Sequence, residues 1–273
     1  MTRSAIEYWR ERVESHHAQT HRARGDRPEG DLWSGLADSF RGDPRRTDDP
    51  VVNLVSEWLA PGKTVLDVGG GAGRYALPFA LKAKQVTVVE PSPAMLEALE
   101  AAKKEAGIEN VSSVAEKWEQ AEVAPHDVVF CANVVYGVTD IEPFLRRLNE
   151  AASEIVAIVV FHEGPLTQLS DLWAAVHREE RINLPALPEL LPVLWEMEVY
   201  PNVTVMPPVA RLMPNKEAAL GLARHMLWVD VGSEADHRLT EAMDRLLVET
   251  PEGVTLRRRA PVPAVVWWRK GVE

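Results

Sequence analysis

The pattern of apolar and polar residues changes period along the chain and predicts a mixture of strands and helices. Short runs rich in apolar and β-branched residues predict five strands in the first part of the chain, at 64–68, 85–90, 111–114, 127–132 and 155–161. Helical spacing occurs between them, most clearly in the segment that begins after Ser92 and stops at Gly107. Strands that alternate with helices in this way predict an α/β fold around a doubly wound, mostly parallel sheet.

The part of the chain beyond residue 162 follows a different pattern. Helical spacing marks four segments, at 166–181, 184–195, 215–228 and 235–250. Alternation typical of strands marks two more, at 198–206 and 262–269. We therefore expect helical lid insertions at about 165–197 and 210–260. Part of the apolar surface of the first insertion must pack on the sheet, and the rest is expected to contribute to the wall of an apolar pocket; the residues concerned are Leu166, Leu169, Trp173, Leu187, Leu190, Leu191 and Trp195.

Residues 1–50 are polar and predict an N-terminal arm or cap outside the main domain, which spans residues 51–273. A weak helical stripe runs through 4–24, and the rest of the arm is rich in Gly, Pro and Asp. Trp33 and Phe40 are unusual in so polar a segment. They either fix the arm to the main domain or help to close a pocket.

Composition narrows the class of function. Apolar residues make up 46% of the 273 residues, which is enough for a substantial core. The net charge of −11 disfavours nucleic acid as a partner, because nucleic acid binding needs a basic surface. A single cysteine excludes an internal disulfide, and no apolar run has the length of a signal peptide or a membrane span, so we expect a cytoplasmic protein with no membrane partner. No Cys/His cluster has the spacing of a metal site, and no feature selects an oligomeric state.

The end of the first predicted strand carries the strongest signal for a ligand. Asp67 precedes a cluster in the pattern G-x-G-x-G, formed by Gly69, Gly70, Gly71 and Gly73. Glycines permit positive φ and let backbone N–H groups approach a ligand, and a helix N-terminus follows. A dinucleotide-binding fingerprint needs a glycine at the sixth position, where this chain has Arg74, and the Asp67 carboxylate would repel a pyrophosphate. An acid at this place suits a cation such as an amino group.

An acid followed by G-x-G-x-G closely resembles motif I of the class I S-adenosylmethionine-dependent methyltransferases. The resemblance covers residues 51–161 well and the last predicted strand weakly. It implies a Rossmann-like sheet with an antiparallel last strand, in which segments 198–206 and 262–269 form the terminal hairpin. It also implies that the glycine loop with Asp67 holds the methionine part of S-adenosylmethionine.

Two more turns supply candidate cofactor-binding residues. Glu90 ends the second predicted strand, where a carboxylate can accept hydrogen bonds from both ribose hydroxyls, and NAD-binding sheets use the same device. Pro91 and Ser92 belong to the same turn. After the third strand, the resemblance implies that Glu116 binds the adenine amino group, with backbone or stacking contacts from Ala115, Lys117 and Trp118.

The ends of the fourth and fifth strands supply the candidates for catalysis. Asn133 and Val134 are interpreted as lining the methyl-transfer site, although the Asn-Pro-Pro-Tyr pattern of enzymes that methylate amides or bases lacks both prolines here. Tyr136 is interpreted as a pocket residue, with a place in the core as the alternative. His162 is the best candidate for a general base toward a hydroxyl acceptor, and Glu163 is the second.

Together these residues predict an S-adenosylmethionine-dependent methyltransferase that acts on a small molecule by in-line transfer. The alternative enzyme class is an NAD-dependent oxidoreductase, which the acid before the glycines and the missing sixth-position glycine disfavour. The alternative outside enzymes is a non-catalytic regulatory protein that binds S-adenosylmethionine.

Overall fold

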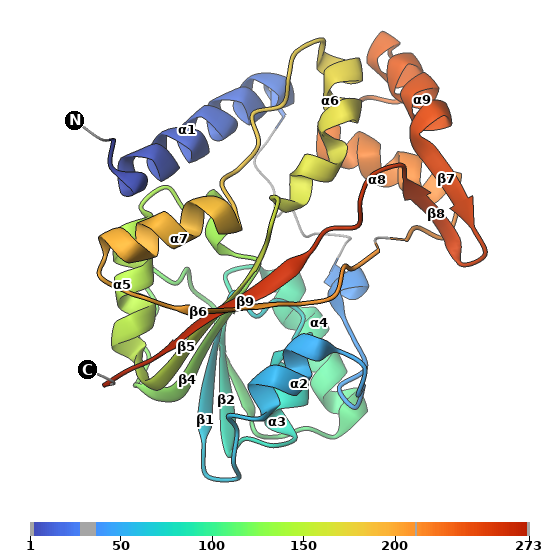
Figure 1. Ribbon diagram of the computed structural model, residues 1–273. Helices are drawn as coiled ribbons and strands as arrows, with labels where there is room; N and C mark the ends of the chain where they lie inside the picture. The colour runs from blue at the N-terminus through green and yellow to red at the C-terminus, as the bar shows by residue number, and fades with distance from the viewer. Residues whose placement is uncertain (1–2, 28–36, 211, 272–273) are drawn as a thin grey trace.

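The computed structural model describes residues 3–27, 37–210 and 212–271, and one seven-stranded sheet runs through these ranges. Its order is β3-β2-β1-β4-β5-β9-β6 (Figure 1). The strands are β1 (Thr64–Val68), β2 (Gln85–Val89), β3 (Val111–Val114), β4 (His126–Ala132), β5 (Ala152–Phe161), β6 (Asn202–Val205) and β9 (Pro263–Arg269). Strands β1 to β5 pair in parallel, whereas β9 is antiparallel to β5 and β6. The predicted α/β fold, with a mostly parallel sheet and an antiparallel last strand, is confirmed.

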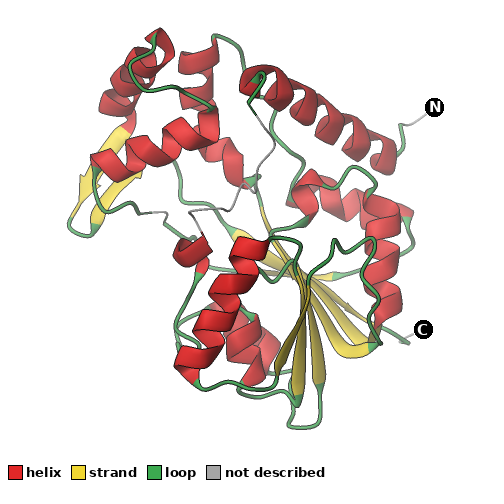
Figure 2. Ribbon diagram, turned by 180° about the vertical axis from the view of Figure 1, so that it is seen from behind, coloured by secondary structure: helices red, strands yellow, loops and turns green. Residues whose placement is uncertain are grey.

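Two layers of helices cover the sheet, and Figures 1 and 2 show them from opposite sides. One face carries α2 (Pro50–Ser56), α3 (Ala76–Ala80) and α4 (Pro93–Ala106). The other face carries α5 (Ile141–Ala151) and α7 (Leu187–Glu196), and the long α1 (Ala5–Arg24) packs across these two helices. Short 3₁₀ helices lie at Ala37–Phe40, Val135–Gly137 and Pro165–Leu169.

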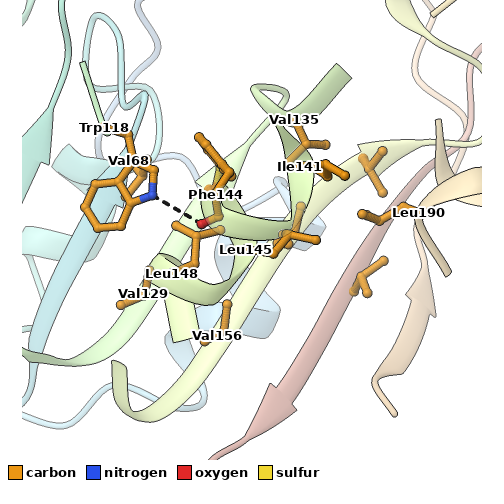
Figure 3. Close-up of a cluster of buried hydrophobic side chains, with 14 of the residues drawn as sticks. Val68, Trp118, Val129, Val135, Ile141, Phe144, Leu145, Leu148, Val156 and Leu190 are labelled. Atoms are coloured by element: carbon orange, nitrogen blue, oxygen red, sulfur yellow. Dashed lines mark hydrogen bonds between the residues drawn. The ribbon is translucent and has the colours of Figure 1, made fainter. Parts of the chain in front are cut away.

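The face that carries α5 buries the core that supports the ends of the central strands. Figure 3 shows side chains of α5 packed against β1, β4 and β5, among them Phe144, Leu145, Leu148, Val68, Val129 and Val156. Leu190 of α7 is fully buried in the same core. Three of the seven residues expected in the pocket wall do not fit that place, because Leu190 and Trp173 are fully buried in hydrophobic cores and Trp195 is 53% exposed at the surface.

A second, smaller hydrophobic core lies beside the sheet, and we call the unit that forms it the cap. The cap consists of α6 (Ser170–His177), α8 (Lys216–Leu227), α9 (Glu234–Leu246), β7 (Leu247–Thr250) and β8 (Gly253–Leu256). Its centre is built around Trp173 and Leu239, which have no exposed surface. Figure 1 shows the cap apart from the sheet, next to one end of α1.

Several element boundaries differ from the sequence prediction, each for a local reason. Helix α3 begins only at Ala76, because the glycine loop continues as a turn up to Tyr75. At the start of α5, Asp140 occupies the cap position and its side chain makes no capping hydrogen bond. The helix expected at 235–250 ends at Leu246, because the chain turns into the β7–β8 hairpin. Trp33 lies outside the described residues, whereas Phe40 packs on a small cluster formed by Ala37, Ala72, Met95 and Ala98.

Candidate functional site

The glycine loop after β1 has the backbone that its sequence requires. Gly69, Gly71 and Gly73 have φ angles of 70°, 54° and 83°, a region that residues with a side chain rarely adopt. A Cβ atom on Gly69 would lie 2.3 Å from Val134 Cγ2, and one on Gly73 would lie 2.5 Å from Leu99 Cδ1. The loop is therefore packed closely between the turn after β4 and helix α4. At Gly71 the nearest side-chain atom to a Cβ would be 3.5 Å away, so this position is less crowded.

Asp67 is a buried carboxylate that lacks a partner. It is 1% exposed, and neither carboxylate oxygen forms a hydrogen bond within the described residues. Burial, together with the negative charge of Glu90, raises the pKa of Asp67 to about 7, while the nearby Ala76 N–H opposes this shift without meeting hydrogen-bond geometry. The carbon of an added side chain on Gly70 would lie 2.8 Å from Asp67 Oδ2. A buried carboxylate without a donor, directly beneath a glycine loop, fits the amino group of a ligand.

Glu90 joins the glycine loop to the turn after β2. The side chain is 6% exposed, and its carboxylate accepts hydrogen bonds from the Gly71 N–H at 3.0 Å and the Ser92 N–H at 2.9 Å. Each carboxylate oxygen has two lone pairs, so an oxygen that accepts one of these N–H groups can also accept a ribose hydroxyl. Ser92 caps α4 with its hydroxyl, and Pro91 lies exposed between the two residues. The carboxylate thus holds the loop in shape as well as lying where a ribose contact was predicted.

The turn after β3 presents three of its four candidates to solvent. Ala115, Glu116 and Lys117 are exposed. Trp118 is 4% exposed, its Nε1 donates a hydrogen bond to the Phe144 carbonyl at 3.4 Å (Figure 3), and the Arg147 guanidinium lies 4.8 Å from its ring. The Trp118 ring therefore belongs to the core and is not available to stack on adenine, whereas its exposed neighbours are accessible.

The turn after β4 is tied to the end of β5 by one side chain. The Tyr136 hydroxyl accepts a hydrogen bond from the Phe161 N–H at 2.7 Å and donates one to Asn133 Oδ1 at 3.3 Å. Burial raises the pKa of the Tyr136 phenol, which keeps it protonated. Asn133 has φ of 61°, a conformation that asparagine tolerates better than most residues. The sequence offered Tyr136 as a pocket or core residue, and the structure places it in the core with a positioning contact.

His162 and Glu163 lie directly beyond β5, at the edge of the sheet where the parallel strands end. Both side chains are exposed. The His162 backbone N–H donates a hydrogen bond to the Val262 carbonyl at 2.9 Å, which fixes this turn against the start of β9. The structure thus brings the ends of β1, β2, β4 and β5 to one edge of the sheet, as doubly wound folds do at their ligand sites.

Helix α1 is fixed to the segment before α7 by side chains that the sequence reading did not single out. His16 Nδ1 lies 2.6 Å from the Ile182 carbonyl, and Arg181 donates to His16 Nε2 at 3.1 Å, so Nδ1 carries the proton. Burial and the Arg181 charge lower the pKa of His16 to about 4. Gln19 adds hydrogen bonds to the Glu180 carbonyl and from the Ile182 N–H. A histidine and a glutamine on one helix face were the only sequence signal for these contacts.

Other kinds of site are not formed by the residues that the structure describes. Within them, no three His, Cys, Asp or Glu side chains come together as a metal site. No helix in the described ranges is both long and apolar enough to cross a membrane. Cys131 is fully buried in β4, where burial raises the pKa of its thiol.

The comparison with known protein families agrees with this geometry. A sequence profile described as a methyltransferase domain matches residues 65–154, from β1 into β5. The matched region contains the glycine loop, Asp67, Glu90 and the turn after β4. No curated protein sequence matches the chain.

Solved structures share the fold at low sequence identity. Magnesium protoporphyrin IX methyltransferase from Synechocystis PCC 6803, with bound S-adenosylhomocysteine, is 13% identical with a TM-score of 0.50, over 98% of this chain and 100% of that chain. Coclaurine N-methyltransferase, bound to N-methylheliamine and S-adenosylhomocysteine, is 15% identical with a TM-score of 0.50, over 96% and 89%. The [4+2]-cyclase SpnF is 17% identical with a TM-score of 0.52, over 89% and 93%.

Residues 65–154 therefore match a methyltransferase domain, and the sheet that contains them has the Rossmann-like fold of these solved structures. This confirms the resemblance drawn from the acid and the glycine loop.

Proposed function

We propose that the protein is an S-adenosylmethionine-dependent methyltransferase that transfers a methyl group to a small molecule. The observation that carries the proposal is Asp67, a buried carboxylate with two unpartnered oxygens beneath a loop of glycines with positive φ. A protein that folded only for stability would leave such a group unpaired at a cost of about 1–3 kcal/mol or more. A ligand with an ammonium group at this place removes that cost.

Different residues of the chain would bind different parts of the cofactor. Asp67 would pair with the amino group of the methionine part, and the N–H groups of the glycine loop would surround that part. Glu90 would accept hydrogen bonds from the ribose, and the exposed Glu116 with Ala115 and Lys117 would contact the adenine. When bound, S-adenosylmethionine supplies a methyl group on a positively charged sulfur, which makes the carbon electrophilic. Asn133 and Val134, beside the loop, would then line the path of the acceptor.

The proposal of a small acceptor is supported by the layers around this edge of the sheet. Helix α1 lies against the turn after β4, since Trp9 Nε1 donates to the Val138 carbonyl at 2.9 Å. The segment before α7 is bound to α1, since His16 Nδ1 donates to the Ile182 carbonyl at 2.6 Å, and the cap lies next to one end of α1 (Figure 1). The net charge of −11 disfavours a nucleic acid acceptor. Two of the similar structures are named as methyltransferases of magnesium protoporphyrin IX and coclaurine, which are small molecules.

Two experiments test the proposal. Isothermal titration with S-adenosylhomocysteine and NAD in parallel is expected to show micromolar binding of the first, about −8 kcal/mol, and none of the second. Transfer from tritiated S-adenosylmethionine to tRNA, rRNA, protein lysate and a small-metabolite extract is expected to label the metabolite fraction. Binding of NAD alone, or label only in RNA or protein, would contradict the proposal.

A second reaction class has one specific observation in its favour. The [4+2]-cyclase SpnF has the same fold, so this sheet also supports chemistry other than methyl transfer. A protein that binds S-adenosylhomocysteine but labels no fraction of the panel would belong to that class or to non-catalytic binding proteins.

A further inference from the structure

One stripe of α1 leads from the core to the edge of the sheet where the candidate site lies. Trp9, Val13 and His17 follow one another at intervals of four residues, so they share one side of the helix. Trp9 and Val13 have no exposed surface and belong to the core under α5. His17 is the next residue of the stripe, and its side chain is exposed. The buried part of this stripe therefore ends at Val13, and His17 is its first exposed side chain.

The imidazole of His17 lies over the turn after β4. A Cβ atom on Gly137 would be 3.7 Å from His17 Nε2, an ordinary contact distance, so the ring lies directly against this turn. Val134, in the same turn, reaches to within 2.3 Å of the place where a Gly69 Cβ would be. The turn after β4 thus contacts His17 through Gly137 and the glycine loop through Val134, so both lie next to the same short turn.

The side chain of His17 is in the chemical state that proton acceptance requires. Within the described residues neither ring nitrogen forms a hydrogen bond or an ion pair with a carboxylate. The ring reaches solvent, yet neighbouring atoms cover enough of it to lower the pKa of His17 below its ordinary value. The neutral imidazole therefore predominates near pH 7, with one nitrogen unprotonated. Among titratable neighbours, the His16 ring lies 6.2 Å away on the same helix, and Arg181 contacts the far side of His16.

We propose that His17 is the general base for the methyl acceptor. The inference rests on the proposed function and adds a residue that touches the acceptor. The acceptor hydroxyl oxygen forms a bond to the methyl carbon while the carbon–sulfur bond breaks. The electron pair of the broken carbon–sulfur bond stays on sulfur. The hydroxyl proton passes to the unprotonated nitrogen of His17, so the positive charge lost at sulfur reappears on the imidazolium. Bulk water then removes this proton from the exposed ring.

His162 is the competing candidate, and the structure distinguishes the two residues by what surrounds them. His162 follows β5 and is held through its backbone against Val262. His17 projects from a helix that is fixed along its length, by Trp9 at one end and by His16 and Gln19 next to it. A base held on a fixed helix keeps its position relative to the acceptor better than one on a turn.

The test compares single substitutions in the full-length protein. Initial rates of transfer from tritiated S-adenosylmethionine to the small-metabolite extract are measured for wild type, His17→Gln, His162→Gln and His21→Gln. His21 is the matched control, because it is an exposed histidine one turn further along α1. We expect His17→Gln to lose at least about a hundredfold in rate, and the other two variants to stay within a few fold of wild type. Unfolding temperature and affinity for S-adenosylhomocysteine are expected to be the same in all four proteins.

A second variant separates proton transfer from a purely structural effect. Added imidazole is expected to restore part of the rate of His17→Ala, because the exposed position leaves room for it. A wild-type rate in His17→Gln, a loss in His162→Gln in its place, or no rescue of His17→Ala would overturn the inference while the proposed function stands. Failure of the wild-type protein to bind S-adenosylhomocysteine or to label any metabolite would overturn the proposed function, and the inference with it.

Discussion

Replacing Asp67 with Asn isolates the energetic cost of the unpartnered carboxylate. The two side chains have nearly the same shape, but Asn carries no charge at any pH. The pKa of Asp67 rises from 3.8 to about 7 on folding, chiefly through burial. One unit of pKa corresponds to about 1.4 kcal/mol, so the ionised carboxylate costs the ligand-free protein on the order of 4 kcal/mol.

The sign of this effect follows from which state holds the proton. Below pH 3.8 the carboxyl group is protonated in both states and contributes nothing to stability. Between pH 3.8 and about 7 the unfolded chain releases the proton while the folded protein retains it, so the free energy of unfolding falls as pH rises. Above about pH 7 both states are ionised and the loss is complete. The Asn variant lacks this loss.

The assay is urea unfolding of both proteins, without ligand, at pH 4 and pH 8. The stability of Asp67→Asn relative to wild type is expected to increase by about 4 kcal/mol between the two pH values, while other titrating groups cancel in the comparison. A difference that does not change with pH, or one that changes in the opposite direction, would refute the argument that Asp67 is buried and unpaired.

Ligand binding is expected to favour wild type over Asp67→Asn, although the Asn variant is the more stable of the two without ligand at pH 8. The amino group of S-adenosylhomocysteine would compensate the Asp67 charge, so the Asn variant is expected to bind it about 1.5–3 kcal/mol more weakly at pH 8. Methylthioadenosine lacks the amino acid part, and its affinity is expected to be equal for both proteins. Equal loss of affinity for the two ligands would place Asp67 elsewhere than at the amino group.

Three further substitutions test individual contacts. Glu90→Ala is expected to weaken S-adenosylhomocysteine binding by about 1.5–3 kcal/mol and also to lower the free energy of unfolding, because the Gly71 and Ser92 N–H groups lose their acceptor. Titration measures the affinity and urea unfolding measures the stability, and an unchanged affinity would count against the ribose contact. Gly71→Val should abolish binding, because φ is 54° and a β-branched residue tolerates it poorly; a variant that titrates normally would show that the loop is only a turn. Tyr136→Phe is expected to cost about 1–2 kcal/mol of stability and leave the pH profile of transfer unchanged, and a changed profile would give the phenol a chemical role.

The fold of residues 51–161 follows closely from the sequence because its signals are local. The predicted ranges of β1 and β3 equal the observed ones, and α4 begins at Pro93 and ends before Gly107 as its cap residues indicate. The β7–β8 hairpin was missed, since its residues continue the helical spacing of α9 up to Thr250. Whether residues 247–250 continue the helix or form a strand depends on tertiary packing in the cap, where Val254 pairs with Met213. The spacing of apolar residues in the sequence does not contain this information.

The candidate site likewise contains some residues whose positions follow from the local sequence and others whose positions depend on the fold. The positions of Asp67 and Glu90 follow from strand ends and glycines, which are properties of neighbouring residues. That Trp118 packs under α5 and that Tyr136 bonds the Phe161 N–H depend on elements about 25 residues away in the chain. His17 had no signal at all in the sequence, because its neighbour Gly137 is 120 residues further along and only the fold brings the two together.

Helix α1 contacts both hydrophobic cores of the molecule, through Trp9 and Val13 at one end and Ala23 at the other. A helix of 20 residues is about 30 Å long and bends little, so it holds the sheet and the cap at a fixed separation. Because the hydrogen bonds of Trp9, His16 and Gln19 fix α1 along its length, a substitution at Ala23 is expected to loosen the cap and to leave the position of His17 over the turn after β4 unchanged.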